Sequence, residues 1–266
     1  MIANQGSESG YVLIDSGDGR KLERFGPHVL DRPCAQAVWR AEGKWKADAR
    51  FVRDQGWSGE LPEEWTIEVE GIQFRLSPTD FGHLGIFPEQ APTWKWLQER
   101  VESGTRVINL FAYSGGVTLA AAKAGAEACH VDASKGMVAW ARENARLNGL
   151  EEAPIRWIVD DAIKFLRREV KRGRKYDVVV LDPPSFGRGA KGEVFKIDEE
   201  IQELLELCRQ LEPRVVIFSC HTPGYTPICL HNLLSQVFGK GKIEVGEMVL
   251  GGERPVPSGT FGRWEA

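Results

Sequence analysis

A glycine-rich turn follows an apolar segment near the middle of the 266-residue chain. The sequence Val107-Ile-Asn-Leu-Phe-Ala-Tyr-Ser-Gly-Gly-Val-Thr118 leads from a predicted strand through Ser114-Gly115-Gly116 into a predicted helix. Glycines let the backbone approach a ligand closely, and the amides at a helix start attract anions. The turn therefore predicts a site for a nucleotide-like cofactor, although glycines there can also serve only the close packing of strand and helix.

Acidic residues stand where the next two strands are expected to end. Asp132 comes nearly twenty residues after the glycine turn, where a carboxylate can accept hydrogen bonds from ribose hydroxyls. Asp161 follows the third predicted strand and can accept a hydrogen bond from an adenine amino group. An N-cap role for Asp160 or Asp161 is equally natural, and the two roles can coexist.

A carboxylate and two prolines end the fourth apolar segment, in Val178-Val-Val-Leu-Asp-Pro-Pro-Ser-Phe186. The Pro-Pro pair fixes φ and removes two N–H donors, so nearby carbonyl groups stay free to accept hydrogen bonds from a planar substrate. Pro-Pro also occurs in ordinary turns. Its place after an acidic residue at a buried strand end favours a substrate site, with Asp182 as a catalytic group.

Cys220 ends the fifth apolar segment, in Phe218-Ser-Cys-His221. A thiolate is a nucleophile, but a thiol with the ordinary pKa of about 8.5 is only slightly ionised at neutral pH. Neighbouring His221 can assist ionisation if it lies on the same side. The alternative is that Cys220 is a small buried residue at a strand end, because cysteine is among the most buried residue types.

These residues require a scaffold that brings several strand ends together, as an open α/β sheet does. From about residue 91, strands alternate with amphipathic helices, which predicts a Rossmann-like α/β domain with a seven-stranded, mostly parallel sheet. The predicted strands are Arg106–Phe111, Ala128–Val131, Ile155–Val159, Asp177–Leu181, Val215–Cys220, Ile243–Leu250 and Thr260–Trp264. The predicted helices are Val117–Ala124, Lys135–Leu147, Ala162–Lys171, Ile197–Gln210 and Pro227–Phe238. Only a loop separates the last two strands, so we expect them to form an antiparallel hairpin at a sheet edge.

Residues 1–90 are predicted to form a small β-rich accessory domain, followed by the α/β domain over residues 91–266. Tyr11–Asp15 and Lys21–Phe25 flank an Asp-Gly pair, which is a strong hairpin signal. Thr66–Glu70 and Ile72–Leu76 predict a second hairpin around Gly71. The tryptophans of this region can stack on bases or pack a small core, and they are Trp39, Trp45, Trp57 and Trp65.

The net charge, the cysteines and the apolar segments indicate which partners and which location in the cell to expect for this protein. The net charge of −4 lacks the global basic field of proteins that coat nucleic acid. A basic stretch over residues 164–175 can contact phosphates or form the solvated face of a helix. The five cysteines include no CxxC pair, so we expect reduced thiols and no metal site. The chain shows no signal peptide and no membrane span, and a cytoplasmic protein with no membrane partner is predicted.

Taken together, these motifs resemble the class I S-adenosylmethionine-dependent methyltransferases, and specifically the group of bacterial large-subunit ribosomal RNA cytosine-5 methyltransferases. The likeness covers roughly residues 66–266. It rests on the glycine turn, the carboxylates at strand ends, Asp182-Pro-Pro184, Asn144, and Asn148-Gly149. The resemblance implies S-adenosylmethionine as cofactor, held by Phe87, Gln90, Asn109, Phe111, Tyr113, Ser114, Gly115, Asp132, Ala133, Ser134, Asp161, Ala162 and Asp182. The segment Gly85–Gln90 departs from the family pattern, because Ala91-Pro92 stands where an arginine commonly follows the glutamine.

The resemblance also implies an acceptor for the methyl group, and the group that the chain resembles favours carbon 5 of a cytosine in ribosomal RNA. Cys220 would then add to carbon 6 of the base and Asp182 would assist at its N3 edge. Substrate contacts are expected from Pro183, Pro184, Ser185, Phe186 and Arg188. Residues 187–196 would close over the substrate, with Arg188 and Lys191 near phosphate, or form an ordinary surface loop.

Other functions remain open from the sequence. Methyl transfer to a base nitrogen or to a non-RNA acceptor would use the same Asp-Pro-Pro motif, although Ser185 separates it from the aromatic Phe186. A catalytically inactive cofactor-binding module is a further alternative, because the N-terminal region lacks the complete basic RNA-binding module of the relatives. A nicotinamide-dependent oxidoreductase is disfavoured, since the turn does not read GxGxxG.

Overall fold

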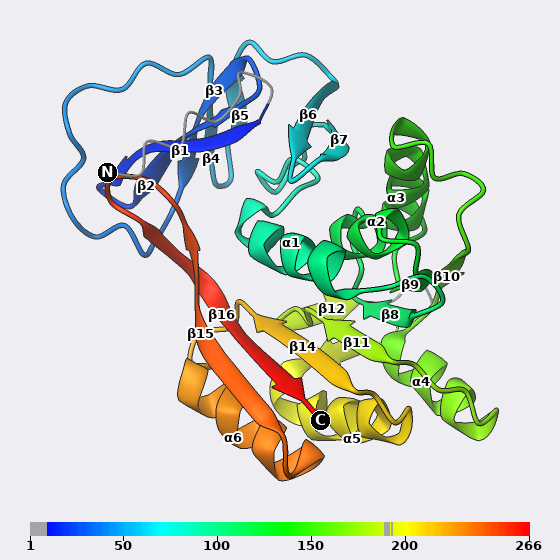
Figure 1. The fold of residues 1–266 in the computed structure, drawn as a ribbon. Helices are drawn as coiled ribbons and strands as arrows, with labels where there is room; N and C mark the ends of the chain where they lie inside the picture. The colour runs from blue at the N-terminus through cyan, green and yellow to red at the C-terminus, as the bar shows by residue number, and fades with distance from the viewer. Residues whose placement is uncertain (1–9, 189–191, 193) are drawn as a thin grey trace. The chain divides into compact units, whose positions relative to one another are not determined.

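The computed structural model describes residues 10–188, 192 and 194–266. The chain divides into two compact units (Figure 1). The first comprises Met1–Ala91 and Val249–Ser258, and the second comprises Pro92–Met248 and Gly259–Ala266. Residues 249–258 thus group with the first unit, whereas the predicted α/β domain included them. The domain boundaries stay a prediction.

A seven-stranded sheet forms the centre of the second unit, in the order β10-β9-β8-β11-β14-β16-β15. Its strands are β8 (Arg106–Leu110), β9 (Glu127–Asp132), β10 (Ile155–Val159), β11 (Val178–Leu181), β14 (Val215–Cys220), β15 (Lys242–Leu250) and β16 (Val256–Glu265). The first five of these in spatial order are parallel, and β16 runs antiparallel to β14. The predicted fold class is confirmed.

Within the described residues, helix α1 (Ala91–Arg100) precedes β8 and five α-helices connect the strands of the sheet. The connecting helices are α2 (Gly116–Lys123), α3 (Lys135–Leu147), α4 (Ala162–Lys171), α5 (Ile197–Gln210) and α6 (Pro227–Phe238). Helices α3 to α6 begin and end where the sequence predicts. Local capping explains part of this agreement, because Ser134, Asp161 and Thr226 each accept a hydrogen bond from an amide in the first turn of the following helix. Helix α1 was not predicted.

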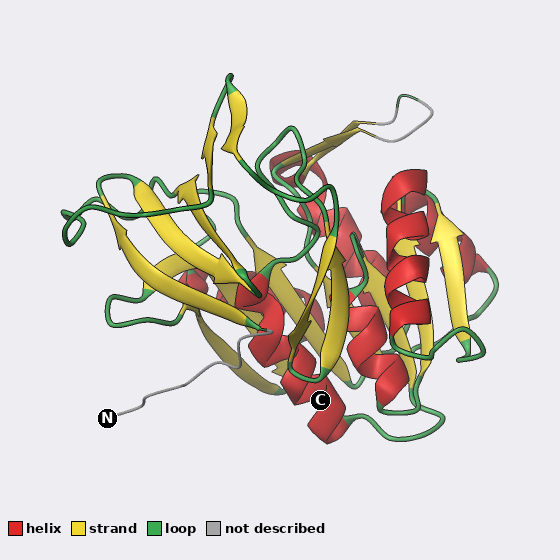
Figure 2. Ribbon diagram, turned by 90° about the horizontal axis from the view of Figure 1, so that it is seen from above, coloured by secondary structure: helices red, strands yellow, loops and turns green. Residues whose placement is uncertain are grey.

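Helices cover both faces of the sheet (Figure 2). On one face, alternate residues of the central strands pack against α4, α5 and α6 in a single apolar core. These strand residues include Ile108 and Leu110 of β8, Val179 and Leu181 of β11, and Phe218 of β14. All four residues of β11 are buried, as expected for a parallel strand that is covered on both faces. The carboxyl ends of β8, β11 and β14 are thereby fixed side by side.

A buried carboxylate, Glu169 of α4, ties this helix to its surroundings. It accepts hydrogen bonds from Arg156 at 3.0 Å, from the Tyr176 hydroxyl at 2.6 Å and from Arg172 at 3.1 Å. Burial acts to raise the pKa of Glu169, but the hydrogen bonds from Arg156 and Tyr176 outweigh it, so that the pKa is lowered. Glu169 is therefore charged in the folded protein.

Replacement of Glu169 by glutamine is expected to lower the free energy of unfolding by about 2 kcal/mol, because a buried network loses its charge. A group with a lowered folded pKa stabilises the fold above its ordinary pKa of 4.5, and this contribution is lost as the pH falls through the lowered value. The difference between wild type and variant in urea unfolding should therefore shrink under acid conditions. Glu203→Gln is the control, since Glu203 pairs with Arg167 at the surface and should cost less than about 1 kcal/mol. An equal loss in both variants would contradict the prediction.

The first unit contains a five-stranded sheet in the order β1-β2-β3-β4-β5 and a separate hairpin, β6-β7. The strands are β1 (Tyr11–Gly17), β2 (Arg20–Phe25), β3 (His28–Pro33), β4 (Ala49–Val52), β5 (Gly56–Gly59), β6 (Trp65–Val69) and β7 (Ile72–Leu76). Both predicted hairpins are present as antiparallel pairs. Strands β3, β4 and β5 were not predicted.

The tryptophans of the first unit have hydrogen-bond partners within it. The indole N–H of Trp39 donates to the Ser16 carbonyl at 2.8 Å, and that of Trp57 donates to the Thr79 carbonyl at 2.9 Å. Trp65 donates to the Phe25 carbonyl at 3.1 Å, and Trp45 donates to the Asp15 carboxylate at 2.8 Å. Such partners are typical of tryptophans that pack a small domain.

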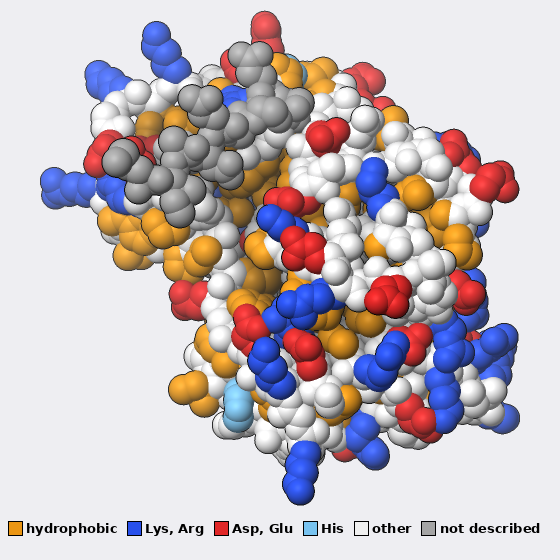
Figure 3. Space-filling view, viewed as in Figure 1, with side chains coloured by type: hydrophobic (Ala, Val, Ile, Leu, Met, Phe, Trp, Pro, Cys, Tyr) orange, Lys and Arg blue, Asp and Glu red, His pale blue; other side chains and the backbone are white. Residues whose placement is uncertain are grey.

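Lys and Arg side chains crowd the surface around α4 (Figure 3). Several of them belong to ion pairs with acidic neighbours: Arg167 with Glu203, Arg168 with Asp160, Arg172 with Glu169, and Lys175 with Glu212. This pairing favours the solvated helix face over a phosphate site. Within residues 10–188, 192 and 194–266, no helix is long and apolar enough to cross a membrane, and no group of three or more potential metal-binding side chains occurs.

Candidate active site

The glycine turn after β8 has an unusual backbone. Phe111 and Tyr113 have φ values of 57° and 50°, and Gly115 has a φ of 96°. Positive φ is uncommon for residues other than glycine, and such strained residues cluster at functional sites. The turn is anchored to the neighbouring strand by the Ala112 amide, which donates to the Val131 carbonyl at 3.0 Å. The strained backbone is therefore held in place by the sheet.

Asp132, at the end of β9, binds this turn directly. Its two carboxylate oxygens accept hydrogen bonds from the amides of Tyr113 at 2.9 Å and Ser134 at 2.8 Å. Burial raises the pKa of Asp132, although both amide hydrogen bonds act to lower it. Each carboxylate oxygen can accept a further hydrogen bond, so that Asp132 both shapes the turn and can bind ribose hydroxyls.

A chain of buried polar groups lies behind the turn. The Asn109 side-chain amide donates to the Thr118 hydroxyl at 3.1 Å, and this hydroxyl is 3.0 Å from Nδ1 of His130. Burial lowers the pKa of His130 to about 3, so the ring is neutral. The structure therefore shows Asn109 as a support of the first turn of α2. Sequence reasoning missed Thr118 and His130, since neither stands at a strand end.

The glycines of the turn are also required by packing. A Cβ atom on Gly115 would lie 3.0 Å from the Cβ of Ala141, and one on Gly116 would lie 2.6 Å from the Trp94 ring. The side chain of Asn144 donates to the Ser114 carbonyl at 2.9 Å, which fixes the turn from α3. Close packing and close approach to a ligand are therefore combined in this turn.

The third strand end carries Asp161, whose side chain accepts a hydrogen bond from the Lys164 amide at 2.9 Å. This is the N-cap arrangement that the sequence left open, and Ala162 is buried as the first residue of α4. Ser134 similarly caps α3, with Ala133 before it. A role of Asp161 and Ala162 at an adenine ring stays a prediction.

Asp182 and His221 face one another at the ends of β11 and β14. The two strands are parallel neighbours, with Leu181 opposite Phe218. Oδ2 of Asp182 is 3.5 Å from Nε2 of His221, which places a carboxylate and an imidazole together at the edge of the sheet. Of the residues after Asp182, Pro183 is buried, whereas Pro184, Ser185 and Phe186 are exposed. An exposed proline, Pro184, and an exposed aromatic ring, Phe186, suit contact with a planar substrate.

Cys220 is the last residue of β14 and only 1% exposed. Burial raises the pKa of its thiol and the charge of Asp182 acts in the same direction, whereas hydrogen bonds from the amide and hydroxyl of Thr222 lower it. The Thr222 hydroxyl is also 2.8 Å from the Ser185 hydroxyl. The sulfur is therefore shielded in this structure, with polar hydrogens from Thr222 directed at it. No sequence motif indicated Thr222.

The remaining predicted residues lie elsewhere. Phe87 and Gln90 belong to the first unit, where Phe87 precedes the short 3-10 helix η1 (Pro88–Gln90) and its ring lies 5.2 Å from that of His83. Their contact with a cofactor stays a prediction. Arg188 is the last residue of a short strand, β12 (Phe186–Arg188), which pairs with β13 (Val194–Lys196). Lys191 and the side chain of Arg188 lie outside the part of the chain that the structure describes.

The second unit thus carries two half-sites on one edge of its sheet. The glycine turn, Asp132 and Asp161 follow β8, β9 and β10, whereas Asp182 and Cys220 follow β11 and β14. The direction of strand order reverses between β8 and β11, which is where ligands bind in open α/β sheets. A half-buried carboxylate with acceptor capacity, Asp132, beside a strained glycine turn fits a nucleoside-containing cofactor.

Comparison with known proteins agrees with this geometry. A family model described as S-adenosylmethionine-dependent methyltransferase matches residues 39–230. The ribosomal RNA large subunit methyltransferase K/L of Hahella chejuensis is 36% identical over 163 residues, covering 60% of this chain and 22% of that protein. The ribosomal RNA large subunit methyltransferase I of Aeromonas salmonicida is 33% identical over 169 residues, covering 62% and 40%. The chain spans less than half the length of these two relatives.

Solved structures show the same fold. The SAM-dependent methyltransferase from Agrobacterium tumefaciens superposes with a TM-score of 0.91 at 38% identity, covering 97% of this chain and 91% of that one. The protein SMU.776, complexed with SAH, has a TM-score of 0.76 at 21% identity, covering 95% and 76%. The predicted family and its cofactor, S-adenosylmethionine, are confirmed. Since the family model matches well over half of the sequence, the chain belongs to the S-adenosylmethionine-dependent methyltransferase family.

Proposed function

We propose that the protein transfers a methyl group from S-adenosylmethionine to a base of RNA, with carbon 5 of a cytosine in ribosomal RNA as the acceptor. The observation that carries the cytosine assignment is the thiol of Cys220 at the end of β14, on the strand next to that of Asp182. The names of the curated relatives support ribosomal RNA as the substrate class. The bound cofactor supplies an electrophilic methyl group on a sulfonium.

Cytosine carbon 5 is a poor nucleophile, which is why a thiol is needed. The Cys220 thiolate forms a bond to carbon 6, and the electron pair of the C5–C6 double bond becomes available at carbon 5. This pair would bond to the methyl group, while the bond between that methyl group and the sulfonium breaks and leaves the neutral thioether S-adenosylhomocysteine. Asp182 holds the N3 edge of the ring through a shared proton. After methyl transfer, loss of the carbon 5 proton to a base restores the double bond and breaks the bond between sulfur and carbon 6.

The groups around Cys220 stabilise its thiolate form. The amide and the hydroxyl of Thr222 donate hydrogen bonds to the sulfur, and these favour its negative charge. They offset part of the increase in the pKa of the thiol that burial causes. The imidazole of His221, the residue after Cys220, lies 3.5 Å from Asp182. We propose His221 as the base for the thiol proton, because it is the residue next to Cys220 in the chain.

A second candidate is methyl transfer to a base nitrogen. The burial of Cys220 favours it, because a thiol that is 1% exposed must be uncovered before it can attack. In that reaction the carbonyl groups of the Pro183-Pro184 segment would accept hydrogen bonds from the attacking amino group, and Phe186 would stack on the base.

The product of the reaction distinguishes the candidates. Purified protein is incubated with methyl-labelled S-adenosylmethionine and total RNA from a strain that lacks this gene, and the RNA is digested to nucleosides. We expect the label in 5-methylcytidine. Label on a base nitrogen would replace the first candidate with the second, and absence of label from all RNA would sink both and point to another acceptor or an inactive module.

A further inference from the structure

A basic pocket lies wholly within the first unit. This cavity of about 200 Å³ is lined by Lys21 of β2, Arg32 and Pro33 of β3, Phe51 of β4, Arg53, and residues of the segment between Phe81 and Glu89. It is smaller than the roughly 300–1,000 Å³ of pockets for drug-sized ligands, so it suits a single base or phosphate. None of its charged residues takes part in the half-sites of the second unit described above.

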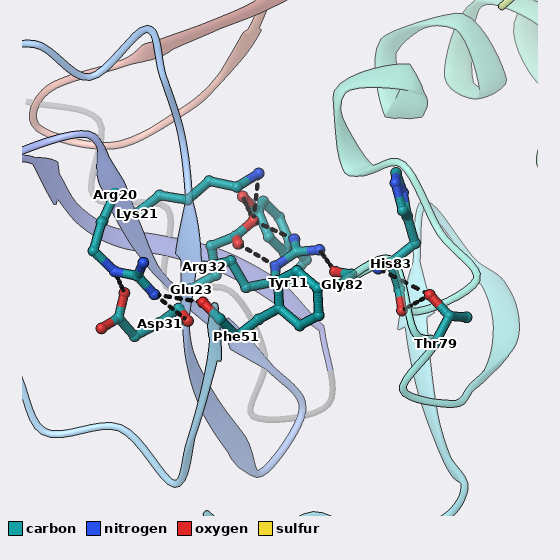
Figure 4. Close-up of polar contacts among 10 residues, drawn as sticks. All are labelled: Tyr11, Arg20, Lys21, Glu23, Asp31, Arg32, Phe51, Thr79, Gly82 and His83. Atoms are coloured by element: carbon teal, nitrogen blue, oxygen red, sulfur yellow. Dashed lines mark hydrogen bonds and ion pairs between the residues drawn. The ribbon is translucent and has the colours of Figure 1, made fainter. Parts of the chain in front are cut away.

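Two cations that form the floor of the pocket, Lys21 and Arg32, belong to an ion network around buried Glu23 (Figure 4). Glu23 is fully buried and accepts two hydrogen bonds from Arg32, at 2.7 and 2.9 Å, and one from the Tyr11 hydroxyl at 3.0 Å. Lys21 lies 3.2 Å from the same carboxylate. Burial acts to raise the pKa of Glu23, but Arg32 and Lys21 lower it, so Glu23 stays charged. The pocket lining carries three cations, Lys21, Arg32 and Arg53, and one carboxylate, Glu89. Together with Glu23 this leaves an excess of one positive charge for an anion.

A rigid turn carries an exposed aromatic ring at the edge of this pocket. Residues 79–83 are closed by hydrogen bonds from the Thr79 amide to the His83 carbonyl at 3.0 Å and from the His83 amide to the Thr79 hydroxyl at 3.1 Å. Between them, the side chain of Phe81 is 82% exposed. An exposed apolar residue alone means little. A phenyl ring held in solvent by a closed turn, next to a cationic pocket, is a surface for stacking.

The turn is fastened to the pocket floor. Nη1 of Arg32 donates to the Gly82 carbonyl at 3.0 Å, as Figure 4 shows. Gly82 has a φ of 78°, and a Cβ atom there would lie 2.5 Å from the Phe51 ring, so only glycine fits. The cationic floor and the aromatic edge are therefore parts of one preorganised structure.

We propose that this pocket binds one unpaired nucleotide of an RNA, with its base stacked on Phe81 and its phosphate held by Lys21 and Arg53. Aromatic stacking together with cationic side chains is how proteins bind single-stranded nucleic acid, because unstacked bases offer their flat faces. The inference rests on the proposed function, since it gives the same RNA a second contact. It adds a site in the first unit to the substrate residues of the second.

Binding of a labelled single-stranded RNA of mixed sequence to the full chain, followed by fluorescence anisotropy, tests the stacking contact. Phe81→Ala should raise the Kd by about tenfold, and Phe81→Leu should do the same because it keeps apolar area without a flat ring. Phe81→Trp should bind at least as well as wild type. Val38→Ala is the matched control, as Val38 is 83% exposed in the same unit and does not line the pocket.

The phosphate contact has its own charge-matched test. Arg53→Ala should weaken binding and reduce the slope of log K against log salt concentration by about 0.7, the value for one phosphate of a single strand. Lys46→Ala removes an equal charge from an exposed residue outside the pocket and should leave the slope within error. Equal effects of the two substitutions would overturn the phosphate assignment.

The outcomes separate this inference from the proposed function. Wild-type affinity in Phe81→Ala overturns the pocket even if the protein methylates RNA, and so does failure of the wild type to bind single-stranded RNA. Wild-type affinity in Phe81→Leu overturns stacking and points to an apolar partner surface. A tenfold loss in Phe81→Ala supports the pocket even if no RNA is methylated.

Discussion

Replacement of Cys220 by alanine is expected to reduce formation of 5-methylcytidine by roughly 10⁴-fold or more, the scale seen when a covalent nucleophile is removed. The reason is that carbon 5 gains its nucleophilic character only after sulfur has added to carbon 6. Cofactor binding should be unchanged, since Cys220 lies on β14 and is not among the residues predicted to hold the cofactor. Transfer of labelled methyl groups to RNA, and calorimetric titration with S-adenosylhomocysteine, measure the two quantities.

The control is Cys229→Ala, because Cys229 is the next cysteine along the chain and lies on α6. It should retain full activity.

Since burial raises the pKa of Cys220, the rate of the wild type should also increase with pH above neutrality until the thiol is ionised. Full activity of Cys220→Ala would remove the covalent mechanism and favour a nitrogen acceptor.

Asp132→Asn is expected to weaken binding of S-adenosylhomocysteine by about 100-fold. The two oxygens of Asp132 each accept a backbone amide, from Tyr113 and from Ser134. An asparagine side chain offers one acceptor and one NH₂ group, so one of these amides would face another donor. The variant therefore loses a ribose acceptor and disturbs the strained turn at the same time. Isothermal titration calorimetry measures the affinity.

Asp177→Asn is the matched control for Asp132→Asn. Asp177 precedes β11, at the opposite end of the sheet, and its carboxylate also accepts a backbone amide, from Arg106 at 2.8 Å. This substitution can lower stability but should not change the affinity for S-adenosylhomocysteine. Similar losses of affinity in both variants would show a general effect on the fold and would contradict a direct role of Asp132.

The sequence alone determined the order of the seven strands of the large sheet and of helices α2 to α6 in the second unit. Helices α3 to α6 have apolar positions with helical spacing, and capping residues such as Ser134 and Thr226 mark where two of them start. Uninterrupted apolar runs such as Val178–Leu181 indicated buried parallel strands. These signals are local, so they could be read without the fold. The rule that ligands bind at carboxyl strand ends then selected Asp132, Asp182 and Cys220.

Elements that depend on distant pairing were not predictable in this way. β3 pairs in parallel with β4 across a long irregular stretch, with Leu30 opposite Ala49. β5 consists of Gly-Trp-Ser-Gly and has no alternation of apolar and polar residues. Such strands form because a partner strand supplies their hydrogen bonds, and sequence patterns do not record that partner.

Only the tertiary structure decided the state of the site residues. It joined Asp132 to the Tyr113 amide, Thr118 to His130, and Thr222 to Cys220 and Ser185. The sequence determined which chemical groups stand at the strand ends. The pKa of each group depends on burial and on hydrogen bonds from residues far away in the chain, and the fold alone brings these together.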